Sequence, residues 1–330
     1  MSFKNVIGID VSKNTIDVCI HNSQSFSQFK NTKKGLVRFF EWVKQNVDNH
    51  MSILFVFEHT GMYSHLLTVF LNDKKCHYLI ASGLDIKRSM GITRGKDDVI
   101  DAKRIALYGH RLKDEIKPSK KRDDSITKLK SLMSLKTKLI KQRASYKATL
   151  REQKSIYKIK DFKTIFCVQE KMIHYITKQI KNIETEILEI IKQDDKLKHN
   201  LTLALSIKGI GLQMATTMII ATDNFQKFEN WRKFASYCGI APFPYQSGTS
   251  IKGRSKVSQL ANKKIKALIH MCAINAIQHN PEMKIYYEKR LELGKNKMST
   301  INIIRNKLIA RIFAVIRRQT PYVDTMKFAS

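Results

Sequence analysis

Acidic residues are scarce in this chain, and their scarcity is the first constraint on what the protein does. Its 330 residues carry 28 Asp and Glu against 60 Lys and Arg, which gives a formal net charge of +32. An excess of this size goes beyond what solubility requires and indicates a polyanionic partner. Since 43% of the residues are hydrophobic and 27% are charged, the composition is globular and excludes a wholly disordered chain.

Other features are missing as well. The five cysteines are scattered without any Cys-x-x-Cys pair, which argues against a zinc site or dithiol redox chemistry and favours buried thiols in a reducing cytosol. No apolar run approaches the roughly 18 to 20 residues of a membrane span, so we expect no membrane partner. The first residues lead directly into a strand, so we expect no signal peptide and a cytoplasmic location.

Proline and glycine are absent from residues 124–197, where the hydrophobic period is helical. Isoleucines at alternating spacings of three and four form one seam, namely Ile173, Ile176, Ile180, Ile183, Ile187 and Ile190. The preceding stretch carries a less regular apolar seam, formed by Leu132, Leu135, Leu139 and Tyr146. The pattern predicts two long helices, joined near residues 158–163, that form a projecting coiled-coil arm. A helical hairpin packed within one globular body is the alternative.

The region before the arm alternates between strand and helix periods. Strands are predicted at residues 5–10, 15–21, 25–30, 53–57 and 77–81, with a helical face at 36–47 between the third and fourth. Three strands followed by helix, strand, helix and strand indicate a mixed sheet covered by helices, and this order is that of a ribonuclease-H-like fold.

We therefore expect an α/β catalytic domain at residues 1–118, a coiled-coil helical arm at 119–200 and a mainly α-helical domain at 201–330. Residues 1–118 hold 18 basic and 12 acidic side chains, whereas residues 119–330 hold 42 and 16. The surface for a polyanion should thus lie mostly in the second part. Helices are predicted there at residues 213–222, 231–238, 258–277, 281–294 and 300–318. In the last of them we expect the apolar residues to face the core and the basic residues to lie elsewhere, namely Ile301, Ile304, Leu308, Ile312 and Val315 inside and Arg305, Lys307, Arg311 and Arg318 outside.

Four acids stand out against this basic background. Asp10 ends the first predicted strand, Glu58 ends a later one, and Asp98 and Asp101 are three residues apart at the start of a predicted helix. Carboxylates facing phosphate would weaken binding unless metal cations stand between them. Two Mg²⁺ ions, for which Mn²⁺ could substitute, would then serve phosphodiester displacement. Asp97 competes with Asp98, because a spacing of four also shares a helix face.

Plainer interpretations of the same acids remain. Each acid alone is more often a helix cap or a surface charge. The turn after Asp10 also resembles the start of actin-like ATPases, although it lacks the glycines that cradle a nucleotide phosphate. A nucleic-acid binder without catalytic activity is a further alternative.

Two features of the last region could bind or cleave a nucleic acid. Gly209 and Gly211 before a predicted helix resemble a helix-hairpin-helix turn whose backbone amides grip a phosphate, although an ordinary interhelical turn fits equally well. Ser247 lies in a polar loop before Gly248, and cations follow at Lys252, Arg254 and Lys256. Such a serine is usually turn chemistry, yet these cations could neutralise a phosphate that it attacks.

Together these segments resemble the DEDD-type transposases of the insertion sequence 110 family over nearly the full chain. The matching motifs include Gly8-Ile9-Asp10-Val11-Ser12-Lys13, Glu58-x-Thr60-Gly61-x-Tyr63, Lys96-x-Asp98-x-x-Asp101-Ala102, Ser206-Ile207-x-Gly209-Ile210-Gly211 and Gln246-Ser247-Gly248. The resemblance implies that Asp10, Glu58, Asp98 and Asp101 bind metal in a RuvC-like domain. It thereby selects Asp98 over Asp97, and it matches Ser247 to the serine of the family's C-terminal domain.

The resemblance also implies a mechanism and partners. The serine would attack a DNA phosphodiester and form a covalent phosphoserine intermediate before the strand is rejoined to donor or target DNA. A noncoding guide RNA and assembly as a dimer or tetramer through the coiled coil are further implications, as is a prokaryotic, nucleoid-associated location. Lys96 would contact the nucleic acid. If water replaced the serine as nucleophile, the chain would be a RuvC-like nuclease acting on branched DNA. One departure from the family is Asp97, where Thr or Asn is expected.

Overall fold

The computed structural model describes residues 3–47, 52–91, 98–115, 117–119, 123–158, 160–248 and 250–324 of the chain. The chain divides into two compact units, Met1–Lys121 and Arg122–Ser330. The helical arm and the C-terminal helices therefore belong to one unit.

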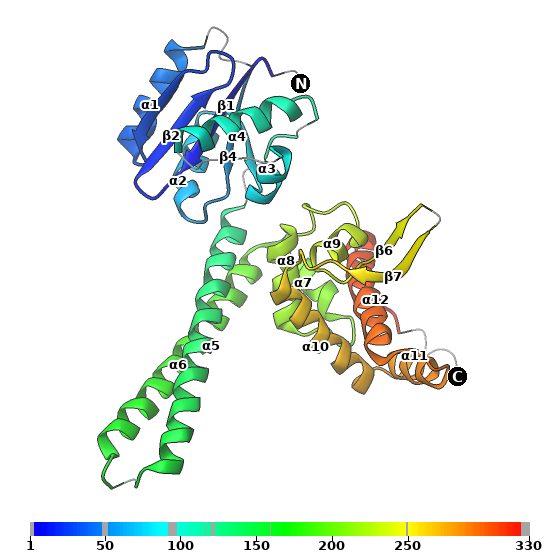
Figure 1. The fold of residues 1–330 in the computed structure, drawn as a ribbon. Helices are drawn as coiled ribbons and strands as arrows, with labels where there is room; N and C mark the ends of the chain where they lie inside the picture. The colour runs from blue at the N-terminus through cyan, green and yellow to red at the C-terminus, as the bar shows by residue number, and fades with distance from the viewer. Residues whose placement is uncertain are drawn as a thin grey trace. The chain divides into compact units, whose positions relative to one another are not determined.

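A five-stranded mixed sheet forms the centre of the first unit (Figure 1). Its strands are β1 (Asn5–Val11), β2 (Thr15–Ile20), β3 (Phe26–Lys30), β4 (Ile53–Glu58) and β5 (His77–Ala81). They lie in the order β3-β2-β1-β4-β5, with β1 antiparallel to β2, β2 antiparallel to β3, and β1, β4 and β5 mutually parallel. The predicted mixed α/β class is confirmed.

Helices cover both faces of this sheet. They are α1 (Lys33–Gln45), α2 (Tyr63–Asp73), α3 (Gly83–Ser89) and α4 (Asp98–Leu112). Alternate strand residues such as Ile7 and Phe55 share one buried cluster with Phe39 of α1 and Leu67 of α2. The residues between them face the opposite side, where α3 and α4 lie (Figure 1).

The backbone of α4 passes directly over Gly8 in β1. A Cβ added to Gly8 would overlap the Ala106 amide nitrogen and the Ala102 carbonyl oxygen. Further along, a Cβ on Gly109 would meet Val56 Cγ2 at 2.6 Å and Val6 Cγ1 at 2.8 Å. Small residues on both elements therefore permit this close approach, and they show that α4 runs antiparallel to β1.

The second unit is helical apart from one two-stranded ribbon. A long helical hairpin consists of α5 (Asp124–Ile156) and α6 (Lys163–Gln193). It is followed by α7 (Asp195–Leu205), α8 (Leu212–Thr222), α9 (Trp231–Tyr237), the antiparallel strands β6 (Pro242–Ser247) and β7 (Ile251–Val257), α10 (Lys263–His279), α11 (Pro281–Glu292) and α12 (Lys297–Arg318). A loop was expected where β6 and β7 pair, so the ribbon is a correction.

The hairpin follows the predicted isoleucine seam on α6, where residues from Ile176 to Ile190 are buried at that spacing. On α5 the prediction is wrong at Leu135, which is 47% exposed. Lys136 takes its place in the seam, because its ammonium group is neutralised by Glu184 Oε1 at 2.9 Å and bonds Gln213 Oε1 at 2.7 Å. This network ties the hairpin to α8.

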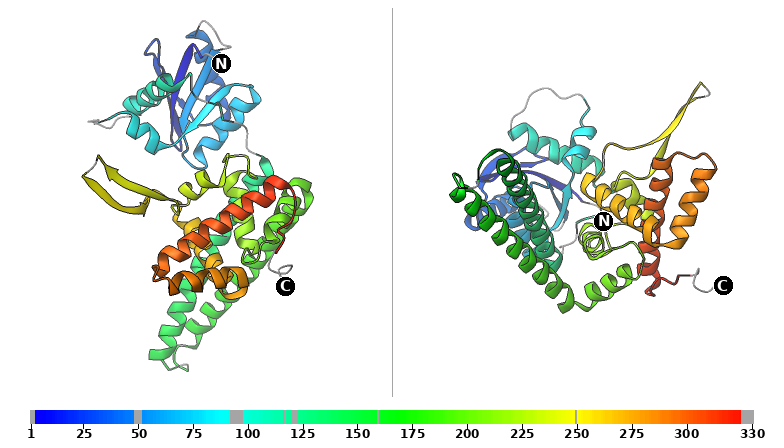
Figure 2. Two further views of the ribbon diagram at one scale, coloured as in Figure 1. Left: turned by 90° about the vertical axis from the view of Figure 1, so that its right-hand side faces the viewer. Right: turned by 90° about the horizontal axis from the view of Figure 1, so that it is seen from below.

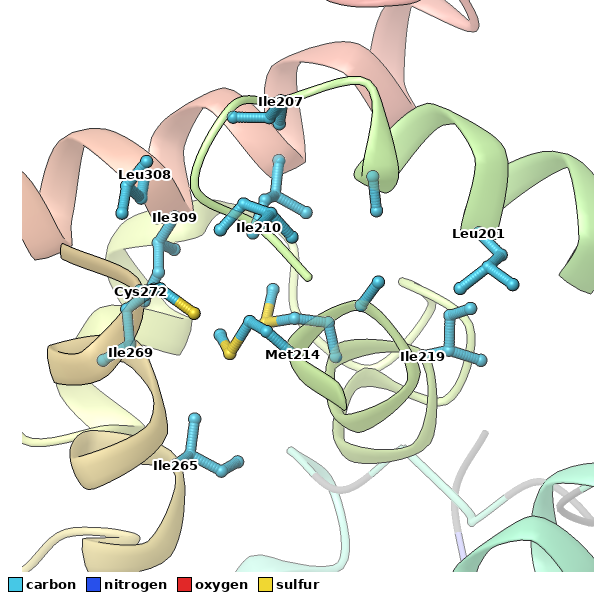
Figure 3. Packing of buried hydrophobic residues seen from close by; sticks show 14 of the residues in the cluster. Leu201, Ile207, Ile210, Met214, Ile219, Ile265, Ile269, Cys272, Leu308 and Ile309 are labelled. Atoms are coloured by element: carbon cyan, nitrogen blue, oxygen red, sulfur yellow. The ribbon is translucent and has the colours of Figure 1, made fainter. Parts of the chain in front are cut away.

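The base of the hairpin shares a core with the remaining helices. Figure 3 shows side chains from the α7–α8 turn, α8, α10 and α12 converging, among them Ile210, Met214, Ile269 and Leu308. On α12 the predicted inward apolar positions are buried. Arg305, expected away from the core, is only 7% exposed, and its guanidinium lies 2.6 Å from His270 Nδ1. Among the described residues, no helix is long and apolar enough to cross a membrane.

Replacing Gly8 with alanine should destabilise the first unit by about 2–3 kcal/mol, because the new methyl group meets α4 backbone that cannot rotate away. Chemical denaturation would measure the change in unfolding free energy. Gly211→Ala is the matched control, since nothing lies within 4 Å of a Cβ added there. Equal stability of the two variants would contradict the close α4–β1 contact.

Low pH should destabilise the same unit through His21 and His110, whose rings stack with centroids 4.0 Å apart. Burial lowers the pKa of both imidazoles, and the positive charge of Lys113 lowers the pKa of each further. The unfolded chain then binds protons more readily. The stabilisation is therefore complete above the ordinary histidine pKa of about 6.5 and is lost as pH falls through the lower folded pKa values.

Thermal unfolding between about pH 7.5 and 5 would measure this effect. His110→Phe, which keeps an aromatic ring but cannot be protonated, should make Tm less dependent on pH than it is in the wild type. His65→Phe, at an exposed histidine of the same unit, should leave the dependence unchanged. If the Tm of both variants depends on pH as that of the wild type does, the stacked histidine pair is not the source of the destabilisation at low pH.

Candidate active site

Two of the predicted acids lie at the carboxyl ends of neighbouring parallel strands. Asp10 is in β1 and Glu58 ends β4, and the register pairs Ile9 with Phe57, so the next residues along are Asp10 and Glu58. Because strand residues alternate between faces, Asp10 points to the same side as Gly8, which is the side covered by α4. Glu58 shares that side with Val56.

The start of α4 reaches the same edge of the sheet. Ala102 lies against Gly8 and Gly109 against Val6, so moving from Gly8 toward Asp10 on the strand means moving toward Asp98 on the helix. Four helical residues and two strand residues each span about 6–7 Å. The first turn of α4, with Asp98 and Asp101, therefore lies beside the strand ends that carry Asp10 and Glu58.

Gly83 of α3 makes room for the Glu58 carboxylate. A Cβ at Gly83 would overlap both carboxylate oxygens of Glu58, and the nearest atom to it is Oε1. The sequence contains no signal for this role, because a glycine after a strand usually indicates only a turn. The structure thus adds Gly83 to the residues that position the acids.

Asp17 is a further acid that sequence reasoning missed. It pairs with Asp10 across β1 and β2, so both project from the same face of the sheet. It is 2% exposed and accepts a hydrogen bond from Gln28 Nε2 at 2.8 Å. Next to it on that face, burial raises the pKa of the Cys19 thiol, although nearby Lys103 opposes the shift. Asp17 is therefore a further carboxyl group on the face of Asp10.

The four predicted acids are not all described at the level of side chains. Asp101 is part-exposed and pairs with Arg104, whose Nη1 lies 3.0 Å from its Oδ1. The side chain of Asp98 lies outside the described residues, as do Lys96 and the competing Asp97. Within the part of the chain that is described, no three acidic, histidine or cysteine side chains are grouped closely enough to hold a metal ion.

Ser247 lies in the second unit, at the end of β6, and is exposed. Figure 2 shows the ribbon of β6 and β7 extending away from the helices of its own unit. Its base is held by α12, because Asn302 Nδ2 and Asn306 Nδ2 both donate to the Ile240 carbonyl oxygen, at 2.9 and 3.1 Å. The serine is thus carried on a projecting element with a fixed base.

The predicted nucleic-acid contacts are distributed over the ribbon and the α7–α8 turn. Arg254 and Lys256 are exposed on β7, whereas the side chain of Lys252 lies outside the described residues. Gly211 caps α8 with no side-chain hydrogen bond to its amides. Gly209 packs on α10, where its Cβ would meet Ala276 Cβ at 2.7 Å, so its small size serves helix packing.

Comparison with known proteins assigns the chain to a family. Residues 7–156 match a transposase family model of the DEDD type from IS110, and residues 201–288 match the model described as Transposase IS116/IS110/IS902 family. The pilin gene-inverting protein of Moraxella bovis is 29% identical over 97% of this chain and 98% of its own length. Its counterpart from Moraxella lacunata is 28% identical over the same shares.

A shorter match links the chain to an insertion element itself. The uncharacterized 43.6 kDa protein of insertion element IS110 from Streptomyces coelicolor is 26% identical over 37% of this chain and 30% of its own length. The two family models cover both the strand ends with the acids and the ribbon with Ser247. The chain therefore belongs to the IS110 family of transposases and is an enzyme that recombines DNA.

Proposed function

We propose that the chain is a serine-using DNA recombinase whose first unit is ribonuclease-H-like, of the RuvC type. The observation that carries the proposal is the placement of Asp10 and Glu58 on one face at neighbouring strand ends, beside the α4 turn with Asp98 and Asp101. Such a concentration of carboxylates in a chain of net charge +32 serves phosphate chemistry only when cations stand between them.

The donor set fits hard divalent cations. Asp10, Glu58, Asp98 and Asp101 offer only carboxylate oxygens, which Mg²⁺ prefers and Mn²⁺ also accepts. When bound, two such ions would polarise the phosphate and neutralise charge on the attacking and leaving oxygens. Gly83 leaves room for the Glu58 carboxylate at this position. The Asp101 carboxylate is paired with Arg104, so a metal cation bound there would share this carboxylate with the guanidinium group.

Ser247 supplies the nucleophile. Its Oγ forms a bond to phosphorus as its proton departs, the bond from phosphorus to one deoxyribose oxygen breaks, and that oxygen takes up a proton. The phosphoserine then reacts with the deoxyribose hydroxyl of the partner strand, which releases Oγ. Because the phosphoester energy is kept, rejoining needs no external energy source.

The basic side chains near the two sites bind the nucleic acids that react. We assign Lys252, Arg254 and Lys256 to the DNA beside the serine, Lys96 to DNA beside the acids, and the Gly209–Gly211 turn to a backbone phosphate. Donor and target DNA are the substrates. A noncoding guide RNA supplies sequence choice by base pairing, which explains a strongly basic second part. The enzyme works at the nucleoid in a prokaryotic cytoplasm.

The names of the full-length relatives indicate the type of exchange. Both Moraxella proteins are called pilin gene-inverting proteins. Inversion and transposition both break strands and rejoin them to new partners, so one chemistry serves either outcome. A mechanism that stores the bond in a phosphoserine suits both.

We also propose that the chain forms a dimer or tetramer through its hairpin as a coiled coil. Outside the buried seam, the N-terminal half of α6 carries a second apolar stripe at spacings of three, four and three residues: Ile165, Val168, Met172 and Tyr175. These side chains are between 38% and 59% exposed. The other flank of the hairpin is a groove lined by Lys147, Arg151 and Lys154 against one acid, Glu170, which pairs with Lys154; the remaining positive charge would repel a second copy. The apolar stripe is therefore the contact between copies.

Ser247→Ala should retain DNA binding but reduce strand exchange by at least about a thousandfold, because the nucleophile is lost. Recombination of a plasmid carrying the element and its target would measure this. Ser255→Ala, at an exposed serine on the other strand of the ribbon, is the matched control and should recombine normally. Normal exchange by Ser247→Ala would exclude the serine mechanism and leave hydrolysis by water.

Val168→Glu combined with Met172→Glu should weaken self-association by roughly 100-fold, since two carboxylates would enter an apolar contact. Light scattering coupled to size exclusion would report the mass of each species. Cys167→Glu adds one carboxylate at the exposed neighbouring position, off the stripe, and should change little. An unchanged mass for the double variant would place the oligomer contact elsewhere.

A further inference from the structure

The ribbon that carries Ser247 exposes two large aromatic side chains. Tyr245 is 65% exposed and Phe243 is 45% exposed, and every residue of β6 is exposed to solvent. β6 therefore contributes nothing to the core of its unit. Exposed rings of this size on a projecting element indicate a contact made with another molecule.

Tyr245 shares the face of Ser247. The two residues are separated by two along β6, the pairing with β7 is regular between them, and strand side chains alternate between faces with that period. Phe243 lies on the other side of a register shift in the ribbon. Across the ribbon Tyr245 pairs with Gly253, and Ser247 pairs with Ile251. A molecule lying along this face would touch Tyr245 and the serine hydroxyl together, since residues two apart on a strand are about 7 Å apart.

Gly253 holds the Tyr245 ring in place. A Cβ added to Gly253 would lie 2.7 Å from Tyr245 Cδ1, so the ring rests on the glycine backbone of the opposite strand. A ring that rests on backbone has fewer rotamers to lose on binding than a free one. Tyr245 thus presents one side to the ribbon and the other to solvent.

The charge around these rings selects the partner. Residues 242–257 include three basic residues and no acid. Arg254 and Lys256 are exposed on β7, and Lys256 pairs with Phe243 across the ribbon. Flat rings interleaved with cations are the arrangement that binds unpaired nucleotides, because bases stack on the rings while cations meet the phosphates.

We propose that the face of Tyr245 and Ser247 receives an unstacked DNA base next to the phosphate that Ser247 attacks, with the Tyr245 ring as the stacking surface. Tyr245 is then a positioning residue. Stacking on its ring draws the flanking nucleotide out of the DNA double helix and sets the phosphate that reacts beside the Ser247 hydroxyl. This inference rests on the proposed serine chemistry for its purpose, although the binding itself does not require that chemistry.

Photocrosslinking tests the proposal without recombination. The Ser247→Ala full chain would be irradiated with a 30-nucleotide single strand in which 5-bromodeoxyuridine alternates with thymidine, and crosslinked peptides would be mapped by mass spectrometry. We expect crosslinks at Tyr245. Affinity for the strand should fall roughly tenfold in Tyr245→Leu and little in Tyr245→Phe, because stacking uses the ring and not the hydroxyl.

Gly253→Ala is the second arm of the test, because it keeps tyrosine but displaces its ring. It should lose most of the crosslink while the fold is preserved, as circular dichroism would verify. Crosslinks confined to other regions, or Tyr245→Leu binding as tightly as the parent, would overturn the stacking role. Because this assay lacks the serine hydroxyl, its outcome is independent of whether Ser247 is the nucleophile.

Discussion

The contact of α4 with Gly8 is the constraint on which the candidate active site depends. Only a residue without a side chain lets helix backbone lie on β1, and that contact fixes both the direction and the height of α4 over the sheet. Asp98 in the first helical turn follows Glu58 by 40 residues and Asp10 by 88, so the acids come from segments that are distant in the sequence. Their assembly is thus a matter of backbone packing, whereas Gly83 adjusts a single carboxylate.

The proposed mechanism divides the chemistry between two units. The acids belong to residues 1–121, and Ser247 belongs to a ribbon of residues 122–330 that is anchored at its base and exposed along β6. In that mechanism neither part completes the reaction by itself, since one prepares the phosphate and the other attacks it.

Strong local patterns allowed much of the fold to be predicted. Short apolar segments indicated all five strands of the sheet, with a continuous apolar run at β4, and the isoleucine spacing indicated α6. The ribbon was missed because Pro242, Pro244, Gly248 and Gly253 read as loop signals. Lys136 in the hairpin seam and Asp17 beside Asp10 could not be foreseen, because burial of a charge depends on partners distant in the sequence. Asp10 and Glu58 were placed at strand ends, but only the sheet order made them neighbours.

In the proposed mechanism, the acids and Ser247 act on one phosphate. Mass spectrometry of denatured, protease-digested wild-type protein, after incubation with DNA from both sides of the exchange site, would detect the covalent intermediate of such a reaction. We expect a nucleotide attached to the peptide that contains Ser247, formed with Mg²⁺ and absent when the metal is chelated or Asp10 is replaced with asparagine. Efficient metal-dependent cleavage that leaves every serine unmodified would contradict it.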